Sequence, residues 1–356
     1  LQKIGAPISP LAKWMPSENT SSVESRNLAR FFAEKLGMTA REYRKTLASL
    51  RKYSNVVEVS MSAKDWDKID YEKVPSKAMA NYRNAYARND SARFTKYIED
   101  VQNGTAKINS GTLFPYDIAR AYYSYPQFNY SQLDFINEVL EEQWKALPNY
   151  AGDQNFLVMA DTSGSMTCYN ALPLMISISL ATYFAEKSKG EFAGKFMTFT
   201  DHPRLVELDQ SKSLLGKLRT VLSSQYVGYD TNLEEAFDVI LKAAVLKNIP
   251  QEEMPKALVV ISDMQINDFG HGRNNLSFTE EMKQRFKDAG YEMPYVVYWN
   301  VNSANPKFLA DANDDKVRFV SGASPTVFKA LCESIDKSAV ELMLDTLNDP
   351  RYNEIV

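Results

Sequence analysis

The stretch Phe156-Leu-Val-Met-Ala-Asp-Thr-Ser-Gly-Ser-Met166 decides how the chain folds. Its five leading apolar residues are typical of a strand that is buried on both faces of a parallel sheet. The strand runs into Asp161, Ser163 and Ser165, which place oxygen-bearing side chains on alternate positions of a tight turn. Because a hard divalent cation prefers oxygen ligands, few of them charged, this turn supplies part of a coordination shell. The sequence therefore predicts an ion-binding turn at the end of a buried strand.

Two later turns offer the remaining ligands. The segment Gly228-Tyr-Asp-Thr-Asn232 carries Thr231 and opens a predicted helix, and the apolar run Leu258-Val-Val-Ile-Ser-Asp263 ends in a carboxylate. Ligands of open α/β sheets bind beyond the carboxyl ends of the strands, which is where these residues fall.

Length and composition indicate a soluble protein of two domains. The chain has 356 residues, of which 44% are apolar and 24% charged, and each half is long enough to bury a core. We find no run of eighteen apolar residues and no signal-peptide pattern, so no membrane partner is expected. Two cysteines, Cys168 and Cys332, suit a reducing, cytoplasmic compartment. Two histidines are too few for a typical zinc cluster.

The two halves differ in charge and in pattern. Residues 1–149 carry a net charge of +4 and residues 150–356 a net charge of −8, and the segment 39–96 alone carries +6. Apolar positions in the first half recur at helical spacing, which predicts helices at 25–36, 40–56, 77–89, 93–101, 116–123 and 133–144. We expect no strand before residue 150. The first domain, 1–149, is therefore predicted to be all-α, with repeated helical hairpins.

From residue 150 apolar strands alternate with helices, which predicts a parallel sheet covered on both faces. Strands are expected at 156–160, 196–199, 204–208, 257–261, 295–299 and 317–320, the second and third forming a hairpin. Helices are expected at 172–187, 214–222, 232–246, 278–287 and 325–347. The predicted fold class is thus α + α/β, with a Rossmann-like, mostly parallel six-stranded sheet in the domain 150–356.

Three motifs occur in a set order and spacing: the Asp-x-Ser-x-Ser turn, a later Thr at a helix start, and an Asp that closes a central strand. This set resembles the metal-ion-dependent adhesion site of von Willebrand factor A domains. The resemblance implies Mg²⁺ or Mn²⁺ held by Ser163 and Ser165, by Thr231, and by Asp161 and Asp263, each of the last three directly or through water. One coordination position is left for a carboxylate from a partner protein. The competing interpretation is a set of structural caps and turns.

The first half carries a second resemblance, on Lys13-Trp-Met-Pro16, Leu36-Gly-Met-Thr39 with Tyr43-Arg44, Val74-Pro-Ser76 with Asn81-Tyr82, and Arg93-Phe94 with Tyr97. These segments are similar to the domain-of-unknown-function family 2828, which joins a helical region to an A-type domain. The layout also resembles the Ro (TROVE-module) ribonucleoproteins, whose helical ring binds small noncoding RNAs. About 150 helical residues are too few for a full ring, so the resemblance implies RNA binding on an outer surface.

RNA binding would use basic side chains for phosphates and aromatic side chains for unpaired bases. The basic candidates share the segment 39–96 and are Arg41, Arg44, Lys45, Arg51, Lys52, Lys77, Arg83, Arg88 and Arg93. The aromatic candidates are Tyr43, Tyr82 and Tyr86. Tyrosines at helical spacing more often belong to a core, and a basic helical surface is often only solvated.

Enzymatic interpretations find no support in the same residues. An aspartyl nucleophile at Asp161 would need a second carboxylate two positions later, where Ser163 stands. Serine catalysis would need a histidine base, and neither His202 nor His271 lies in a context that marks one. Glycine-rich phosphate loops and dinucleotide fingerprints are absent, and Cys168 is more typical of a structural cysteine than of a reactive thiol.

The sequence therefore favours a non-enzymatic, Ro-like ribonucleoprotein scaffold, with small noncoding or structured RNA on the basic helices and a protein ligand on the metal. Two alternatives remain: a metal-dependent protein-binding module without RNA, and a structural component of a larger particle.

Overall fold

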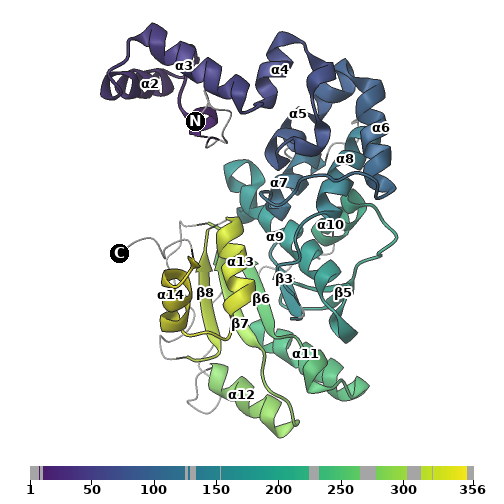
Figure 1. The fold of residues 1–356 in the computed structure, drawn as a ribbon. Coiled ribbons are helices and arrows are strands. Elements are labelled where there is room, and N and C mark those ends of the chain that lie inside the picture. The colour runs from purple at the N-terminus through teal and green to yellow at the C-terminus, as the bar shows by residue number, and fades with distance from the viewer. Residues whose placement is uncertain are drawn as a thin grey trace. The chain divides into compact units, whose positions relative to one another are not determined.

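The computed structural model describes residues 8, 11–124, 127–128, 134–152, 154–223, 232–264, 278–302, 314–322 and 324–350. The chain forms two compact units, Leu1–Asn109 and Ser110–Val356 (Figure 1). The predicted fold class is confirmed: a helical part precedes a six-stranded, mostly parallel sheet with helices.

The first unit is built from helices throughout its described residues. Its α-helices are α1 (Leu11–Trp14), α2 (Val23–Lys35), α3 (Ala40–Tyr53), α4 (Val57–Ala63), α5 (Ser76–Asn89) and α6 (Ser91–Gln102), and the short 3-10 helices η2 (Trp66–Lys68) and η3 (Tyr71–Lys73) connect α4 to α5. The start of α3 follows the predicted capping box. The Thr39 hydroxyl accepts from the Glu42 amide at 3.3 Å, and the Glu42 carboxylate accepts from the Thr39 amide at 2.8 Å, which satisfies two amides that a helix start leaves unpaired.

Aromatic side chains fill the core beneath α5 and α6. The centroid of the Tyr71 ring lies 5.3 Å from that of Tyr86, 5.0 Å from that of Phe94 and 5.4 Å from that of Tyr97. All four rings are buried. Rings in such contact bury large apolar areas, so this cluster explains the helical spacing of the aromatic residues in the sequence.

The second unit is organised around its sheet, in the order β5-β4-β3-β6-β7-β8. The strands are β3 (Phe156–Ala160), β4 (Lys195–Thr198), β5 (Leu205–Glu207), β6 (Ala257–Ser262), β7 (Tyr295–Asn300) and β8 (Val317–Ser321). Neighbours are parallel except β4 and β5, which form the predicted antiparallel hairpin. Every residue of β3 and β6 is buried, as expected for central strands of a parallel sheet.

Helices cover both faces of this sheet. On one face Leu157 and Met159 of β3 pack with side chains of α11 (Leu233–Lys247) and α12 (Phe278–Asp288). On the other face the ring of Phe156 lies 5.1 Å from that of Phe184 in α9 (Cys168–Lys187). Among the described residues, one helical stretch, 164–187, is long and apolar enough to cross a membrane, but 78% of its apolar window is buried inside the protein. Burial on this scale is what a core helix shows.

The second unit also contains the helices α10 (Leu214–Ser223), α13 (Pro325–Ser334) and α14 (Ala339–Leu347). The single helix predicted at 325–347 is wrong, because α13 ends at Ser334 and α14 starts anew. Ser338 and Glu341 form a capping box at that second start, and such a box marks the N-terminus of a new helix.

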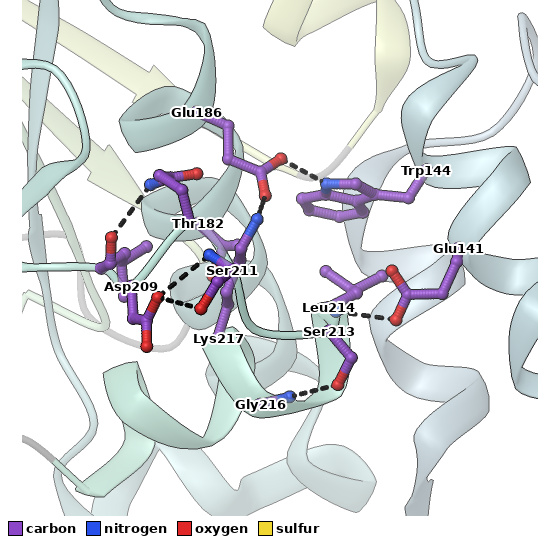
Figure 2. Close-up of polar contacts among 12 residues, drawn as sticks. Glu141, Trp144, Thr182, Glu186, Asp209, Ser211, Ser213, Leu214, Gly216 and Lys217 are labelled. Atoms are coloured by element: carbon purple, nitrogen blue, oxygen red, sulfur yellow. Dashed lines mark hydrogen bonds and ion pairs between the residues drawn. The ribbon is translucent and has the colours of Figure 1, made fainter.

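The first compact unit ends at Asn109 and the second begins at Ser110, whereas the domain boundary predicted from the sequence was residue 149. Helices α7 (Pro115–Ala119) and α8 (Asp134–Lys145) therefore belong to the same unit as the sheet. In Figure 2, Glu186 of α9 accepts from Trp144 of α8, and Glu141 of α8 accepts from the Leu214 amide at the start of α10. These contacts fasten α8 onto α9 and α10.

A two-stranded pair, β1 (Tyr123–Ser124) and β2 (Gln127–Phe128), also precedes residue 150. The expectation of no strand before that point is wrong here, because a two-residue strand is too short to show an alternating pattern.

Candidate metal centre

The carboxyl ends of β3 and β6 lie side by side at the middle of the sheet. Ala160 pairs with Ile261, and the Asp161 amide donates to the Ile261 carbonyl at 3.1 Å. From β3 the chain moves outward to β4 and β5 and then returns to β6 on the other side of β3. This reversal of strand order makes the crevice beyond β3 and β6 the expected ligand site of the sheet. Asp161 and Asp263 lie there, each directly after its strand.

The turn after β3 brings two hydroxyls together. The Ser163 amide donates to Asp161 Oδ1 at 2.8 Å, which folds the turn back on its carboxylate. The Oγ atoms of Ser163 and Ser165 are 3.1 Å apart. In an octahedral magnesium shell with metal–oxygen distances of about 2.1 Å, adjacent ligand oxygens lie about 3.0 Å apart. The hydroxyl pair therefore has the spacing of two neighbouring ligands.

The second oxygen of Asp161 is held from β6. The Ser262 hydroxyl donates to Asp161 Oδ2 at 2.6 Å and accepts from the Met264 amide at 3.1 Å. Ser262 was not among the residues predicted for the site. Its position one residue before Asp263 was the available signal, because a hydroxyl at a strand end lies beside the end of the neighbouring strand.

We call the edge of the sheet beyond the carboxyl ends of β3 and β6 the rim. Two carboxylates are buried there, since Asp161 and Asp263 are each 1% exposed. Burial raises the pKa of Asp161; its hydrogen bonds to Ser163 and Ser262 oppose that rise, and the charge of Asp263 adds to it. Buried like charges are costly unless a counter-charge neutralises them. A cation held between the hydroxyl pair and these carboxylates would provide that charge, so the donor set fits Mg²⁺ or Mn²⁺.

Thr231, the fifth predicted ligand, lies outside the described residues. Its neighbour Asn232 is described, and the Asn232 amide donates to the Thr200 carbonyl at 3.2 Å. Thr200 follows the carboxyl end of β4, the strand next to β3. The side chain of Asn232 caps α11 by accepting from the Glu235 amide at 3.0 Å. The described part of this turn is thus at the same edge of the sheet as Asp161.

Within the described ranges, no group of three or more His, Cys, Asp or Glu side chains is placed to hold a metal ion. A cation at this rim would therefore depend on serine hydroxyls as well as on the two carboxylates, as the sequence predicts.

The backbone next to the hydroxyl pair is strained. Tyr169, Asn170 and Ala171 have φ values of 50°, 57° and 58°, a left-handed run that is rare for residues with a side chain. The regular part of α9 consequently starts at Leu172, as predicted. Burial, followed by the charge of Asp263, raises the pKa of the Cys168 thiol. A raised pKa keeps this thiol protonated, which favours the structural interpretation of Cys168.

The basic residues proposed to contact RNA fall into two groups. Seven side chains are exposed, whereas Arg51 is half-buried and Arg83 is buried. Arg51 donates to the carbonyls of Ala12 and Met15 at 2.8 Å and 2.7 Å, which fastens α1 onto α3.

Arg93 has a similar structural role although it is exposed: it donates to the carbonyls of Trp66 and Ile69. The other exposed members are Arg41, Arg44, Lys45, Lys52, Lys77 and Arg88. Of these, Arg44 pairs with Glu18 and Arg88 donates to the Asn84 carbonyl within its own helix. Of the three tyrosines proposed to stack on bases, Tyr43 and Tyr86 are buried and Tyr82 is half-buried.

These features define a chain of two parts, a helical unit joined to a doubly wound α/β unit. The α/β unit has oxygen-bearing side chains at its switch point, where the strand order reverses between β3 and β6. The chain belongs to the family described as Domain of unknown function (DUF7788), whose model matches residues 155–350. Residues 8–150 match Domain of unknown function (DUF2828), which confirms the resemblance predicted for the first half.

Two known proteins are similar to the chain along most of its length. It is 30% identical over 368 residues to the uncharacterized protein L728 of Acanthamoeba polyphaga mimivirus, and the match covers 98% of this chain and 62% of that protein. The crystal structure of the RO (RSR) protein of Deinococcus radiodurans is similar with 14% identity and a TM-score of 0.43, over 91% of this chain and 72% of that one.

Proposed function

We propose that the chain is a non-enzymatic binding protein whose α/β unit holds one Mg²⁺ or Mn²⁺ ion and uses it to capture a carboxylate from a protein partner. The observation that carries the proposal is the hydroxyl pair of Ser163 and Ser165 beside two buried carboxylates at the switch point of the sheet.

Each residue of this rim has a distinct part in the proposal. Ser163 and Ser165 would hold the ion through their hydroxyls, with Asp161, Asp263 and Thr231 acting directly or through water. When bound, the ion supplies a concentrated positive charge with an open position for an anionic oxygen. The two carboxylates balance the charge of the ion, and a partner's carboxylate would fill the open coordination position.

The first test is stabilisation by the metal. An ion that binds only the folded state at 100 times its Kd stabilises that state by about 2.7 kcal/mol. We expect MgCl₂ or MnCl₂ to raise the Tm of the wild type and not that of Asp161→Asn. Asp288→Asn, an exposed change on α12, is the control and should respond like the wild type. Equal metal-induced shifts in wild type and Asp161→Asn would refute the site.

RNA binding by the first unit is a second candidate, favoured by one observation. Arg41, Lys45 and Lys52 are all exposed on α3 at spacings of four and seven residues, which places them in one row along the helix. A row of cations can follow a phosphate backbone and would make binding sensitive to salt.

Filter binding at low salt tests this candidate with structured and single-stranded RNA. Replacing the three residues together by Gln should weaken retention and flatten its salt dependence. The control replaces Lys212, Lys242 and Lys287, exposed lysines of the second unit, in the same way. No retention by the wild type would remove RNA from the function. Equal loss in both triple variants would refute the row on α3 as the RNA-binding surface.

A further inference from the structure

Ser262 is the last residue of β6 and is completely buried. Its hydroxyl lies between the ends of two strands rather than facing solvent. A buried hydroxyl is costly unless it is hydrogen-bonded, and this one makes the two contacts described above, to Asp161 and to the Met264 amide.

The direction of this hydrogen-bond chain is determined by its chemistry. A backbone amide can only donate, so the Met264 N–H occupies a lone pair of the Ser262 oxygen. The single hydroxyl proton of Ser262 is then directed at Asp161 Oδ2. Since Oδ1 already accepts from the Ser163 amide, both oxygens of Asp161 are held, and the carboxylate cannot rotate without losing a hydrogen bond.

The same hydroxyl also stabilises the turn that carries Asp263. Met264 directly follows Asp263 and has φ 61°, a left-handed conformation that is unfavourable for a residue with a side chain. The hydrogen bond from its amide to Ser262 helps to hold that conformation. Ser262 therefore touches both sides of the rim: the carboxylate after β3 and the backbone of the turn after β6.

We propose that Ser262 is a positioning residue for the divalent cation, which couples the orientation of Asp161 to the turn bearing Asp263. This inference rests on the proposed metal site and adds to it a residue that does not touch the ion. Hydrogen-bond partners of metal ligands commonly contribute 10- to 100-fold to metal affinity, roughly the effect expected here.

The experiment measures Mn²⁺ binding to the full chain by isothermal titration, with the Tm of each metal-free variant determined in parallel. Ser262→Ala should raise the Kd for Mn²⁺ at least about tenfold. Ser262→Thr, which keeps the hydroxyl and has a high propensity for strands, should restore a Kd within about threefold of the wild type. Ser262→Cys, similar in size but a weak donor, should fall between them and serves if Ser262→Ala does not fold.

The matched control is Ser179→Ala. Ser179 is also completely buried, in α9, and its hydroxyl donates to the Ile176 carbonyl at 3.1 Å. Its loss should leave the Kd for Mn²⁺ unchanged.

The outcomes separate this inference from the function on which it rests. A wild type that does not bind Mn²⁺ refutes the proposed metal site itself. A wild type that binds, with Ser262→Ala binding equally well, refutes the role of Ser262 alone. A lowered metal-free Tm of Ser262→Ala with an unchanged Kd identifies the hydroxyl as merely structural and also overturns the inference.

Discussion

Trp144 and Glu186 are 42 residues apart in the chain and connect α8 to α9: the indole Nε1 donates to Glu186 Oε2 at 2.6 Å (Figure 2). The other oxygen of Glu186 pairs with Lys217 Nζ, also at 2.6 Å. Glu186 thus joins α8, α9 and α10, and its side chain and that of Lys217 are only 16% and 11% exposed. This contact explains why the segment after residue 110 belongs with the sheet.

Replacing Glu186 by Ala should destabilise the second unit strongly. The change leaves the part-buried Lys217 without its ion pair and Trp144 without its acceptor. Leaving such a group unsatisfied costs about 1–3 kcal/mol, and more when the group is charged. Urea unfolding followed by tryptophan fluorescence measures the loss.

The comparison is Glu191→Ala, which removes an exposed ion pair with Lys247. Pairs of that kind contribute about 1 kcal/mol or less. Similar losses in the two variants would contradict the structural role assigned to Glu186.

Glu141 should make stability depend on pH. Burial raises the pKa of this carboxyl above 4.5, against the hydrogen bond from the Leu214 amide and the charges of Lys145 and Lys217. A carboxyl whose pKa is higher in the folded state stabilises that state most below pH 4.5, and the contribution is lost as pH rises through the folded pKa.

Glu141→Gln keeps an oxygen for the Leu214 amide and removes the titration. We therefore expect its free energy of unfolding at pH 7 to equal or exceed that of the wild type, and to vary less between pH 4.5 and 7. Unfolding by urea at several pH values measures both quantities. A variant that is clearly less stable than the wild type at pH 7 would show that the ionised carboxylate is favourable in its place.

The hydroxyl of Thr39 should stabilise the start of α3. Thr39→Ala removes the acceptor of the Glu42 amide and should cost about 1 kcal/mol. Thr39→Ser keeps the acceptor and should cost less. Thermal unfolding monitored by circular dichroism checks the order, and an equal loss in both variants would attribute the effect to the lost methyl group instead.

Ser163 and Ser165 should be dispensable for folding and necessary for the metal. Ser163 is exposed and Ser165 half-buried, so each change to Ala should alter the metal-free stability by about 0.5 kcal/mol or less. The rise of Tm in MnCl₂ should be reduced or lost in both. Ser223→Ala, an exposed change at the end of α10, is the control, and a full metal response in both site variants would exclude the hydroxyl pair as ligands.

The sequence by itself determined the elements of the sheet and the residues at their carboxyl ends. Strands β3 and β6 are continuous apolar runs because both of their faces are buried, and that pattern is local. The turn residues Asp161, Ser163 and Asp263 could be placed at one rim because parallel strands end at the same edge.

Only the tertiary structure decided which residues far apart in the chain meet. Ser262 and Asp161 are 101 residues apart, and no periodicity predicts that the hydroxyl of one orients the carboxylate of the other. In the sequence Arg51 and Arg93 look like any other surface cation. Only the fold shows that each binds carbonyls of distant residues. The same holds for α8, whose helical pattern is visible locally, whereas its attachment to α9 through Glu186 depends on contacts that a local pattern does not record.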